Sequence, residues 1–548
     1  MTYSMPFAHS LRRPVESRRA LAQRRKMLAM GAVLAIGIAL ALAFLLMGCG
    51  GGSSTPVSPP VVAPVQALQT ADVRNIVQAA VNSVDVDMVV AVVDRAGFLL
   101  GVFRTPNAPS AAIGNFGLTQ DANDVAVSLA RTGAFFSNDQ APLSSRTVRF
   151  ISGIHFPPGV MNQPTADLYG IENTNRGCTL VNDATFESKV PPSQALMGGP
   201  GLGIMTGKAD MMDSKPNTVN PGGVPIFYKN VVVGGVGVVT SASSNLNVAE
   251  YAAFVGSITQ RTGPGDSFGP TPAPPGVVFI GGIALPFVDQ ATLPTGFSAG
   301  PVAGSAGTFT KGPTDSQGQP PEGDLIAPAA GPMGGLSAAD VTTILDNAEA
   351  TANTERAAIR LPLGSKTRMV IAVADLDGTI IGLRRMVDAT VFSIDVAASK
   401  ARNMVYFDGP TRTAADLNQV PMGTAVTNRT ISFGAQPLFP PGIDGSSPGP
   451  FFNLYLMDTA NPCTQGFQGG AVNANKSGIV FFPGSAGLYR GGTLVGGLGV
   501  SGDGVDQDDF VTSGGTKGFE APTNIRADQI VINGVRLPYF KFPRNPTQ

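Results

Sequence analysis

The chain has 548 residues, 37 basic and 38 acidic side chains, and a formal net charge of −1. This length suits two sizeable domains plus linkers. The charge is balanced and no basic run follows residue 26, which argues against nucleic acid as a partner. His155 is the only histidine after the N-terminal region. That scarcity argues against a zinc enzyme, a two-histidine metal site and histidine-based acid–base chemistry.

Residues 1–48 are predicted to be an export leader. Basic residues between Arg12 and Lys26 precede an uncharged apolar segment of about 20 residues, which is long enough to span a bilayer. The segment ends in Leu46-Met47-Gly48-Cys49, which resembles the lipobox of bacterial lipoproteins. We therefore expect Cys49 to be lipidated and residues 49–65 to be a flexible tether on the periplasmic or outer-membrane side of the cell envelope. The alternative is an uncleaved signal anchor.

The remaining chain is predicted to contain two copies of one domain. Each copy opens with apolar residues at helical spacing, at 68–81 and 336–348. A strand, an Asp-x-x-Gly turn and a returning strand follow in each copy, at 88–103 and 369–383. We place copy one at 66–293, a Pro/Gly/Ser-rich surface linker at 294–335 and copy two at 336–543.

Two further repeats concern the candidate site. The helical segments 124–131 and 395–402 align without a gap, and Leu129 stands in copy one where copy two has Lys400. Glycine-rich strands at 231–240 and 494–501 predict a strand that another element approaches closely. The acids that follow the second strand are expected to cap the next helix; binding of a divalent cation is the alternative. They are Asp503, Asp506, Asp508 and Asp509.

Cys178 and Cys463 occupy the same relative place in the two copies. In an oxidising compartment this arrangement is compatible with a disulfide across the two halves. Two separate buried thiols are the alternative, since sequence does not establish the geometry of a bond.

The motifs at 369–375, 399–402 and 496–509 resemble those of the GlcG/HbpS-like haem-binding (haem-degrading) family. The resemblance implies an α+β domain, with an antiparallel sheet of about five strands and packed helices. Because members often self-associate, two joined copies are expected to form a pseudo-dimer. The resemblance also implies binding of haem or a related small molecule. Copy one lacks the Ser-Gly-Asp-Gly turn of residues 501–504, so copy two is expected to be the ligand-binding half.

The candidate ligand-binding residues come from these motifs and from the needs of haem iron. Lys400 and Arg402 are candidates for binding a propionate or another carboxylate, although both residues also suit a solvated helix face. Tyr489 and His155 are candidate axial ligands, and each also has an ordinary structural interpretation. Ser501 and Asp503 belong to the turn that carries the resemblance. No metal site and no catalytic residue are assigned.

We therefore expect an envelope-anchored binding protein for haem or a related small molecule, with self-association as a further expectation. One alternative is a surface structural or interaction module without a small ligand. Another is an enzyme that acts on a small acid or a tetrapyrrole through Lys400, Arg402 and the acidic loop. The sequence contains no nucleophile elbow, phosphate loop or Cys–His pair, so the enzyme is not favoured.

Overall fold

The computed structural model describes residues 67–176, 178, 220–269, 277–300, 306–461, 463–464 and 477–547. These residues belong to one compact unit, Pro64–Gln548. The expected leader and its lipidation site, Cys49, lie outside the described residues. Within the described ranges, no helix has both the length and the apolar character that a bilayer crossing requires.

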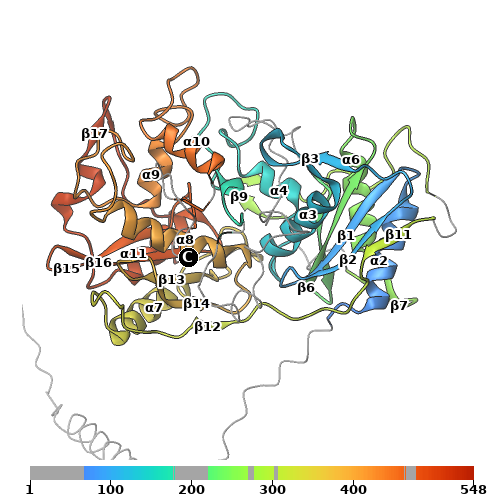
Figure 1. Ribbon diagram of the computed structural model, residues 1–548, viewed down its shortest axis with the longest axis horizontal. Coiled ribbons are helices and arrows are strands. Elements are labelled where there is room, and N and C mark those ends of the chain that lie inside the picture. The colour runs from blue at the N-terminus through green and yellow to red at the C-terminus, as the bar shows by residue number, and fades with distance from the viewer. Residues whose placement is uncertain are drawn as a thin grey trace, which may run out of the picture. The chain divides into compact units, whose positions relative to one another are not determined.

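Two five-stranded antiparallel sheets with the same strand order form the framework (Figure 1). The first sheet has the order β11-β2-β1-β6-β5 and the second β12-β14-β13-β16-β15. In the first, the strands are β1 Met88–Asp94, β2 Leu99–Arg104, β5 Gly223–Tyr228, β6 Val231–Thr240 and β11 Thr308–Lys311. In the second, they are β12 Gly323–Ile326, β13 Val370–Ala374, β14 Ile380–Arg385, β15 Ser485–Arg490 and β16 Thr493–Ser501. The predicted α+β class with sheets of about five strands is confirmed.

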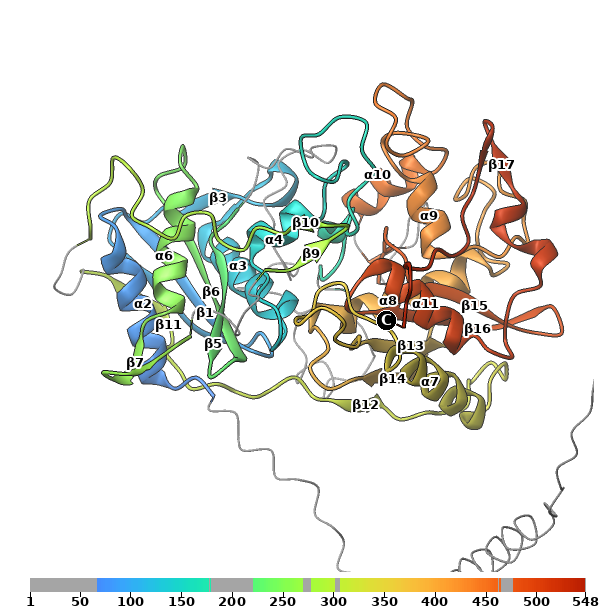
Figure 2. The same ribbon diagram turned by 180° about the vertical axis from the view of Figure 1, so that it is seen from behind.

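Helices cover both faces of the first sheet, and β1 shows why. Val89 and Ala91 pack in the cluster that contains α3 (Ala122–Phe136), whereas Val90 and Val92 pack with α2 (Thr70–Ser83) and α6 (Asn247–Ser257). Successive side chains of a strand point to opposite faces, so this uniformly apolar strand is buried on both sides. Figure 2 shows α2 and α6 beside the strands of this sheet.

In the second half, α8 (Phe392–Phe407) packs on β16, and α7 (Ala338–Ala352) packs against α11 (Val505–Gly515). Three shorter helices lie in the long middle segments of the two copies: α4 Ser145–Phe150, α9 Asn428–Gly434 and α10 Phe452–Ala460. Small two-stranded sheets complete the structure: β3 Ala111–Ile113 with β4 Thr119–Asp121, β7 Gln260–Gly263 with β8 Asp266–Ser267, β9 Phe279–Ile280 with β10 Ile283–Ala284, and β17 Val531–Ile532 with β18 Val535–Arg536. β9/β10 and β17/β18 are short hairpins that follow the last long strand of each half.

The glycines of β6 and β16 allow a helix to lie directly on the strand. A Cβ atom at Gly499 would overlap the carbonyl oxygen of Ala397 on α8. A Cβ atom at Gly237 would overlap the carbonyl oxygen of Ala126 on α3 in the same way. The predicted close approach is therefore confirmed in both halves, and the overlapping atoms are backbone atoms that belong to a helix.

The predicted capping role of the acids after β16 is wrong. Helix α11 has Gly504 at its N-cap, with φ +141°, and no side chain caps it. The Asp503 carboxylate instead accepts the main-chain N–H of Arg368 at 2.7 Å and pairs with Arg360. Asp506 and Asp508 do lie in the first helical turn, where negative charge is favourable.

The connector at 294–335 does more than link the copies. It supplies the edge strand of each sheet: β11 pairs with β2, and β12 pairs with β14. Each strand has only four residues, so neither has a hydrophobic period that would reveal it in the sequence.

The two halves share one hydrophobic cluster, which contains residues of α3, α7 and α8. The rings of Phe136 and Phe392 stack with centroids 4.0 Å apart, and those of Tyr169 and Tyr455 with centroids 5.1 Å apart. The Asn138 side chain donates to the carbonyl oxygen of Ile359 at 3.1 Å. Both apolar and polar contacts therefore hold the halves together.

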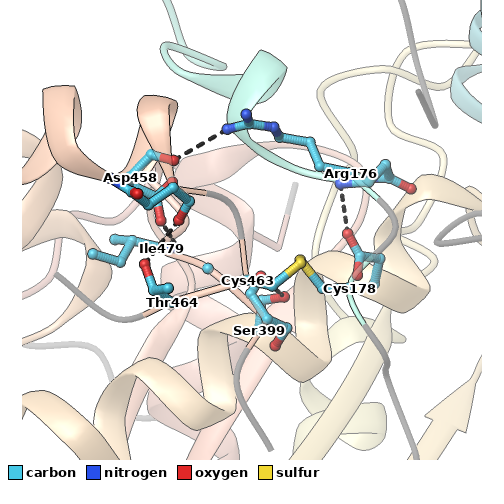
Figure 3. The surroundings of a disulfide bond; sticks show 12 residues. Arg176, Cys178, Ser399, Asp458, Cys463, Thr464 and Ile479 are labelled. Atoms are coloured by element: carbon cyan, nitrogen blue, oxygen red, sulfur yellow. Dashed lines mark hydrogen bonds between the residues drawn. A yellow bond between two sulfur atoms is a disulfide. The ribbon is translucent and has the colours of Figure 1, made fainter. Parts of the chain in front are cut away.

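A disulfide joins Cys178 of the first half to Cys463 of the second (Figure 3). Nearby, the Arg176 guanidinium donates to the main-chain oxygens of Asp458, at 3.2 Å, and Thr459, at 2.8 Å. The two cysteines are 285 positions apart in the sequence, so the bond removes many conformations from the unfolded chain.

We expect Gly499→Ala to lower the free energy of unfolding by about 2–3 kcal/mol, because its methyl group must displace the α8 backbone. Gly263→Ala is the matched control, since a Cβ atom there meets nothing within 4 Å. Urea unfolding of both variants measures the difference. Equal stability of Gly499→Ala and the unchanged protein would refute the close-packing argument.

Candidate functional site

Lys400 is fully buried and connects three elements of the second half. Its Nζ donates to the carbonyl oxygen of Val500 on β16 at 2.7 Å and to Asp508 Oδ2 on α11 at 2.9 Å. The Nζ also lies 5.0 Å from the centroid of the Phe482 ring, a cation–π distance. The solvated helix face considered for Lys400 is therefore wrong.

Burial shifts both partners of this ion pair. It lowers the pKa of Lys400 and raises the pKa of Asp508 to about 7, because each charged form loses its water. The attraction between the two groups opposes both shifts. Near neutral pH, the Asp508 carboxyl is thus a group that can gain or lose a proton.

Glu355 is a second buried acid in this region. It is fully buried just after α7, and neither of its carboxyl oxygens has a hydrogen-bond partner. Burial raises the pKa of Glu355 to about 9, and the negative charge of Asp508 adds to the rise. Glu355 is therefore protonated at neutral pH.

Arg402 is buried and stabilises the turn between β13 and β14. Its Nε donates to the carbonyl oxygen of Gly378 at 2.9 Å. In the first half, Arg131 makes the same bond to Gly97, also at 2.9 Å. The shared contact indicates that this arginine holds the hairpin in both halves.

The residues of the Ser-Gly-Asp-Gly turn are also bonded within the protein. Ser501 Oγ donates to Ser393 Oγ at 3.0 Å. The buried Asp503 pairs with Arg360, whose guanidinium also contacts Asp388 at 2.6 Å. Burial raises the pKa of Asp503, and the arginine opposes that rise.

Tyr489 and His155, the two candidate axial ligands, each contact an aspartate, and neither is among the described residues that line the pockets beside Asp508 and Arg429. The Tyr489 hydroxyl donates to Asp408 Oδ2 at 3.0 Å. His155 Nε2 lies 2.5 Å from Asp444 Oδ1, so this contact links the first half to the second.

Two adjoining pockets lie where the halves meet. The inner pocket is small, with a volume of about 20 Å³, which is room for about one water. Its wall includes Ser501 and Asp508 together with Phe136, Phe392 and Phe482. The outer pocket has about 310 Å³, and Asp167 and Val505 line both spaces. We call the two pockets together the junction site.

The outer pocket combines cations with apolar surface. Arg429 pairs with Asp509 and, at 2.6 Å, with Asp506; Lys541 lies 2.8 Å from Asp506. The Lys541 side chain is 66% exposed, so an incoming anion can reach it. Apolar contacts come from Phe433 and several prolines. This lining suits an apolar molecule that carries a carboxylate.

Asp167 contributes a titrating group from the first half. Burial raises its pKa to about 6, the Asp506 charge adds to the rise, and Lys541 and Arg429 oppose it. The charge of the junction site therefore changes just below neutral pH.

Part of the candidate region could be predicted from the sequence. Ser501 and Asp508 line the inner pocket, and Lys400 bonds to Asp508. Lys541 and Asp167 of the junction site, and Glu355 near Asp508, were not predicted, because these residues come from segments far apart in the chain. Arg429 had a weak signal, since Arg146-Thr147 in copy one repeats Arg429-Thr430. In the part of the chain that the structure describes, no three His, Cys, Asp or Glu residues gather as a metal site.

Comparison with known proteins supports a family relationship for the second half. Residues 336–516 match the family described as "Haem degrading protein HbpS-like". No curated protein matches the chain. A solved structure titled "Crystal Structure of PduOC:Heme Complex" is similar at 23% identity and TM-score 0.23, covering 34% of this chain and 97% of that one. The Klebsiella pneumoniae protein ORFY is similar at 20% identity and TM-score 0.22, covering 34% and 92%.

We expect Glu355→Gln to stabilise the protein increasingly as the pH rises. The folded-state pKa of about 9 exceeds the ordinary value of 4.5, so the stability that protonated Glu355 contributes is fully present below pH 4.5 and is lost as the pH rises through 9. Glutamine does not ionise and avoids that loss. The gain should be roughly 2–5 kcal/mol at pH 9 and near zero at pH 4.5.

Urea unfolding at several pH values measures this effect. Glu349→Gln is the matched control, because Glu349 lies in the same region of the chain but has a side chain 37% exposed and paired with Arg384. If the free energy of unfolding changes with pH in the same way for Glu355→Gln and the unchanged protein, Glu355 is not a buried neutral acid.

Proposed function

We propose that this protein binds haem or a related small molecule at the junction site. The observation that carries the proposal is the match of residues 336–516 to the HbpS-like family. That region contains Arg429, Asp506 and Asp508, which line the junction site, whereas Lys541 lies beyond it. No reaction is assigned.

The lining of the outer pocket supports recognition of a flat apolar molecule through its carboxylates. Arg429 and Lys541 provide the positive charge, and a ligand carboxylate would replace Asp506 as their partner. The residues that line the outer pocket in the described part of the chain include no His, Cys, Met or Tyr, the usual axial ligands of haem iron. The described lining thus suits the propionates of haem and contains none of these iron ligands.

Binding should therefore depend on the carboxylates more than on the metal. We expect the chain from residue 50 onward, which contains the whole compact unit, to bind haemin and metal-free protoporphyrin IX with dissociation constants within about threefold of each other. Absorption titration in the Soret region measures both. Lys541→Glu should weaken both affinities about tenfold, because it places a negative charge beside the ligand carboxylates.

Lys517→Glu is the matched control, since Lys517 is exposed and lines none of the pockets described here. The absence of a saturable Soret shift would refute haem-class binding. A shift that survives Lys541→Glu unchanged would place the ligand elsewhere.

We also infer that the protein is exported and held at the cell envelope through Cys49. The basic leader, the apolar segment and the lipobox-like sequence support this localisation. The Cys178–Cys463 disulfide supports it independently, because such bonds persist in oxidising compartments.

We expect Cys49→Ser to abolish incorporation of labelled palmitate into the protein. The unchanged protein should carry the label and sediment with the membranes. An unlabelled protein that remains with the membranes whether or not Cys49 is replaced would instead support an uncleaved signal anchor.

A further inference from the structure

The first half contains a larger cavity, of about 510 Å³, at a place distinct from the junction site. Its wall is formed by β3, by Leu129 on α3, by the end of β6 and by Leu246 and Ala249 at the start of α6. This volume falls within the range typical of small-molecule sites.

Structural equivalences place this cavity where the second half holds its buried ion pair. Arg146 pairs with Glu250 on α6, as Arg429 pairs with Asp509 on α11. Ala249 directly precedes Glu250, and Asp508 directly precedes Asp509. Ala249 therefore corresponds to Asp508. The gap-free alignment of α3 with α8 places Leu129 at the position of Lys400.

The substitutions remove the charged groups from this place. In the second half, the Lys400 side chain reaches from the helix to Val500 and Asp508. In the first half, neither Leu129 nor Ala249 can form such a pair. The two residues that line the cavity at these positions are therefore uncharged.

The lining of this cavity selects against charge. Among the described residues that line it, none is acidic, basic or histidine. Ile113 and Leu246 line the cavity and are themselves 51% and 37% exposed, and the polar residues Asn220, Ser241 and Ser243 line it too. A charged ligand would lose water here without meeting an opposite charge on these described residues.

Thr240 supplies a hydroxyl to this largely apolar wall. It is 8% exposed, lines the cavity, and its hydroxyl has no hydrogen-bond partner. The oxygen is covered by neighbouring atoms, so the side chain must rotate to present it to a ligand. A buried hydroxyl without a partner is unfavourable, so a ligand oxygen that bonded to it after that rotation would be favoured.

We propose that this cavity binds a neutral, largely apolar molecule that carries one hydrogen-bonding oxygen, such as a long-chain alcohol. Leu129 and Ala249 leave this part of the wall uncharged, and Thr240 holds the oxygen. The ligand differs in charge from the one proposed for the junction site, and the described residues that line the two sites do not overlap.

The test uses the neutral fluorescent probe N-phenyl-1-naphthylamine with the chain from residue 50 onward. We expect saturable binding at one probe per chain, displaced by 1-decanol at least tenfold more effectively than by decanoate. Ala249→Met should abolish probe binding, because its longer side chain projects into the cavity where the probe would lie. Thr240→Val should weaken displacement by decanol about fivefold while probe binding persists.

A second variant, Leu129→Lys/Ala249→Asp, installs the ion pair of the second half and should also abolish binding. Circular dichroism confirms folding of each variant, and retained haemin binding by Ala249→Met separates this cavity from the junction site. If the unchanged chain does not bind haemin, only the proposal for the junction site is refuted. Absent or non-saturable probe binding, binding unaffected by Ala249→Met, or equal displacement by decanoate would overturn the cavity proposal.

Discussion

The close contact between a helix and a glycine-rich strand is the constraint on which both candidate sites depend. The α8 carbonyl groups of Ala397 and Ala401 lie over Gly499 and Gly497 so closely that neither glycine has room for a Cβ atom. This contact brings Lys400 near enough to β16 to donate to Val500. The side chain then lies between strand and helix, where water is excluded and its pKa falls. A looser contact would leave Lys400 on a solvated helix face, as its position in the sequence alone suggested.

The same framework gives two different environments because few side chains differ. Each half has an arginine–acid pair between a short helix and the helix that follows the glycine-rich strand. The pair joins α4 to α6 in the first half and α9 to α11 in the second. Only the second half has the Lys400–Asp508 pair. Removing one member of a buried pair is costly, whereas replacing both by apolar groups is often tolerated. Leu129 and Ala249 represent such a joint replacement, and the first half keeps the same sheet order without the ion pair.

Much of the fold could be predicted from the sequence because its signals are local. The Asp94 turn is an example: the carboxylate accepts the main-chain N–H groups of Ala96 and Phe98, as the Asp-x-x-Gly pattern indicates. Strands β11 and β12 escaped prediction because pairing with a sheet edge, rather than periodicity, defines them. Glu355 and Lys541 escaped because only tertiary packing brings them near α11. The difference between Lys400 and Leu129 was visible in the sequence, but the cavity beside Leu129 was not, because its wall comes from β3, β6 and α6, which are far apart in the chain.

The presence of two similarly built halves in one chain removes a restriction that symmetry places on a homodimer. In a symmetric dimer, any residue that one subunit contributes to its partner's site is contributed in return, so both junction sites are identical. Here Asp167 of the first half faces a site whose other charged groups, Arg429, Asp506 and Lys541, belong to the second. The connector strands and the Cys178–Cys463 disulfide join the halves covalently, so their contact needs no second chain. The first half can therefore have Leu129 and Ala249 where the second half has the Lys400–Asp508 pair. One chain can thus contain a charged site and a neutral one.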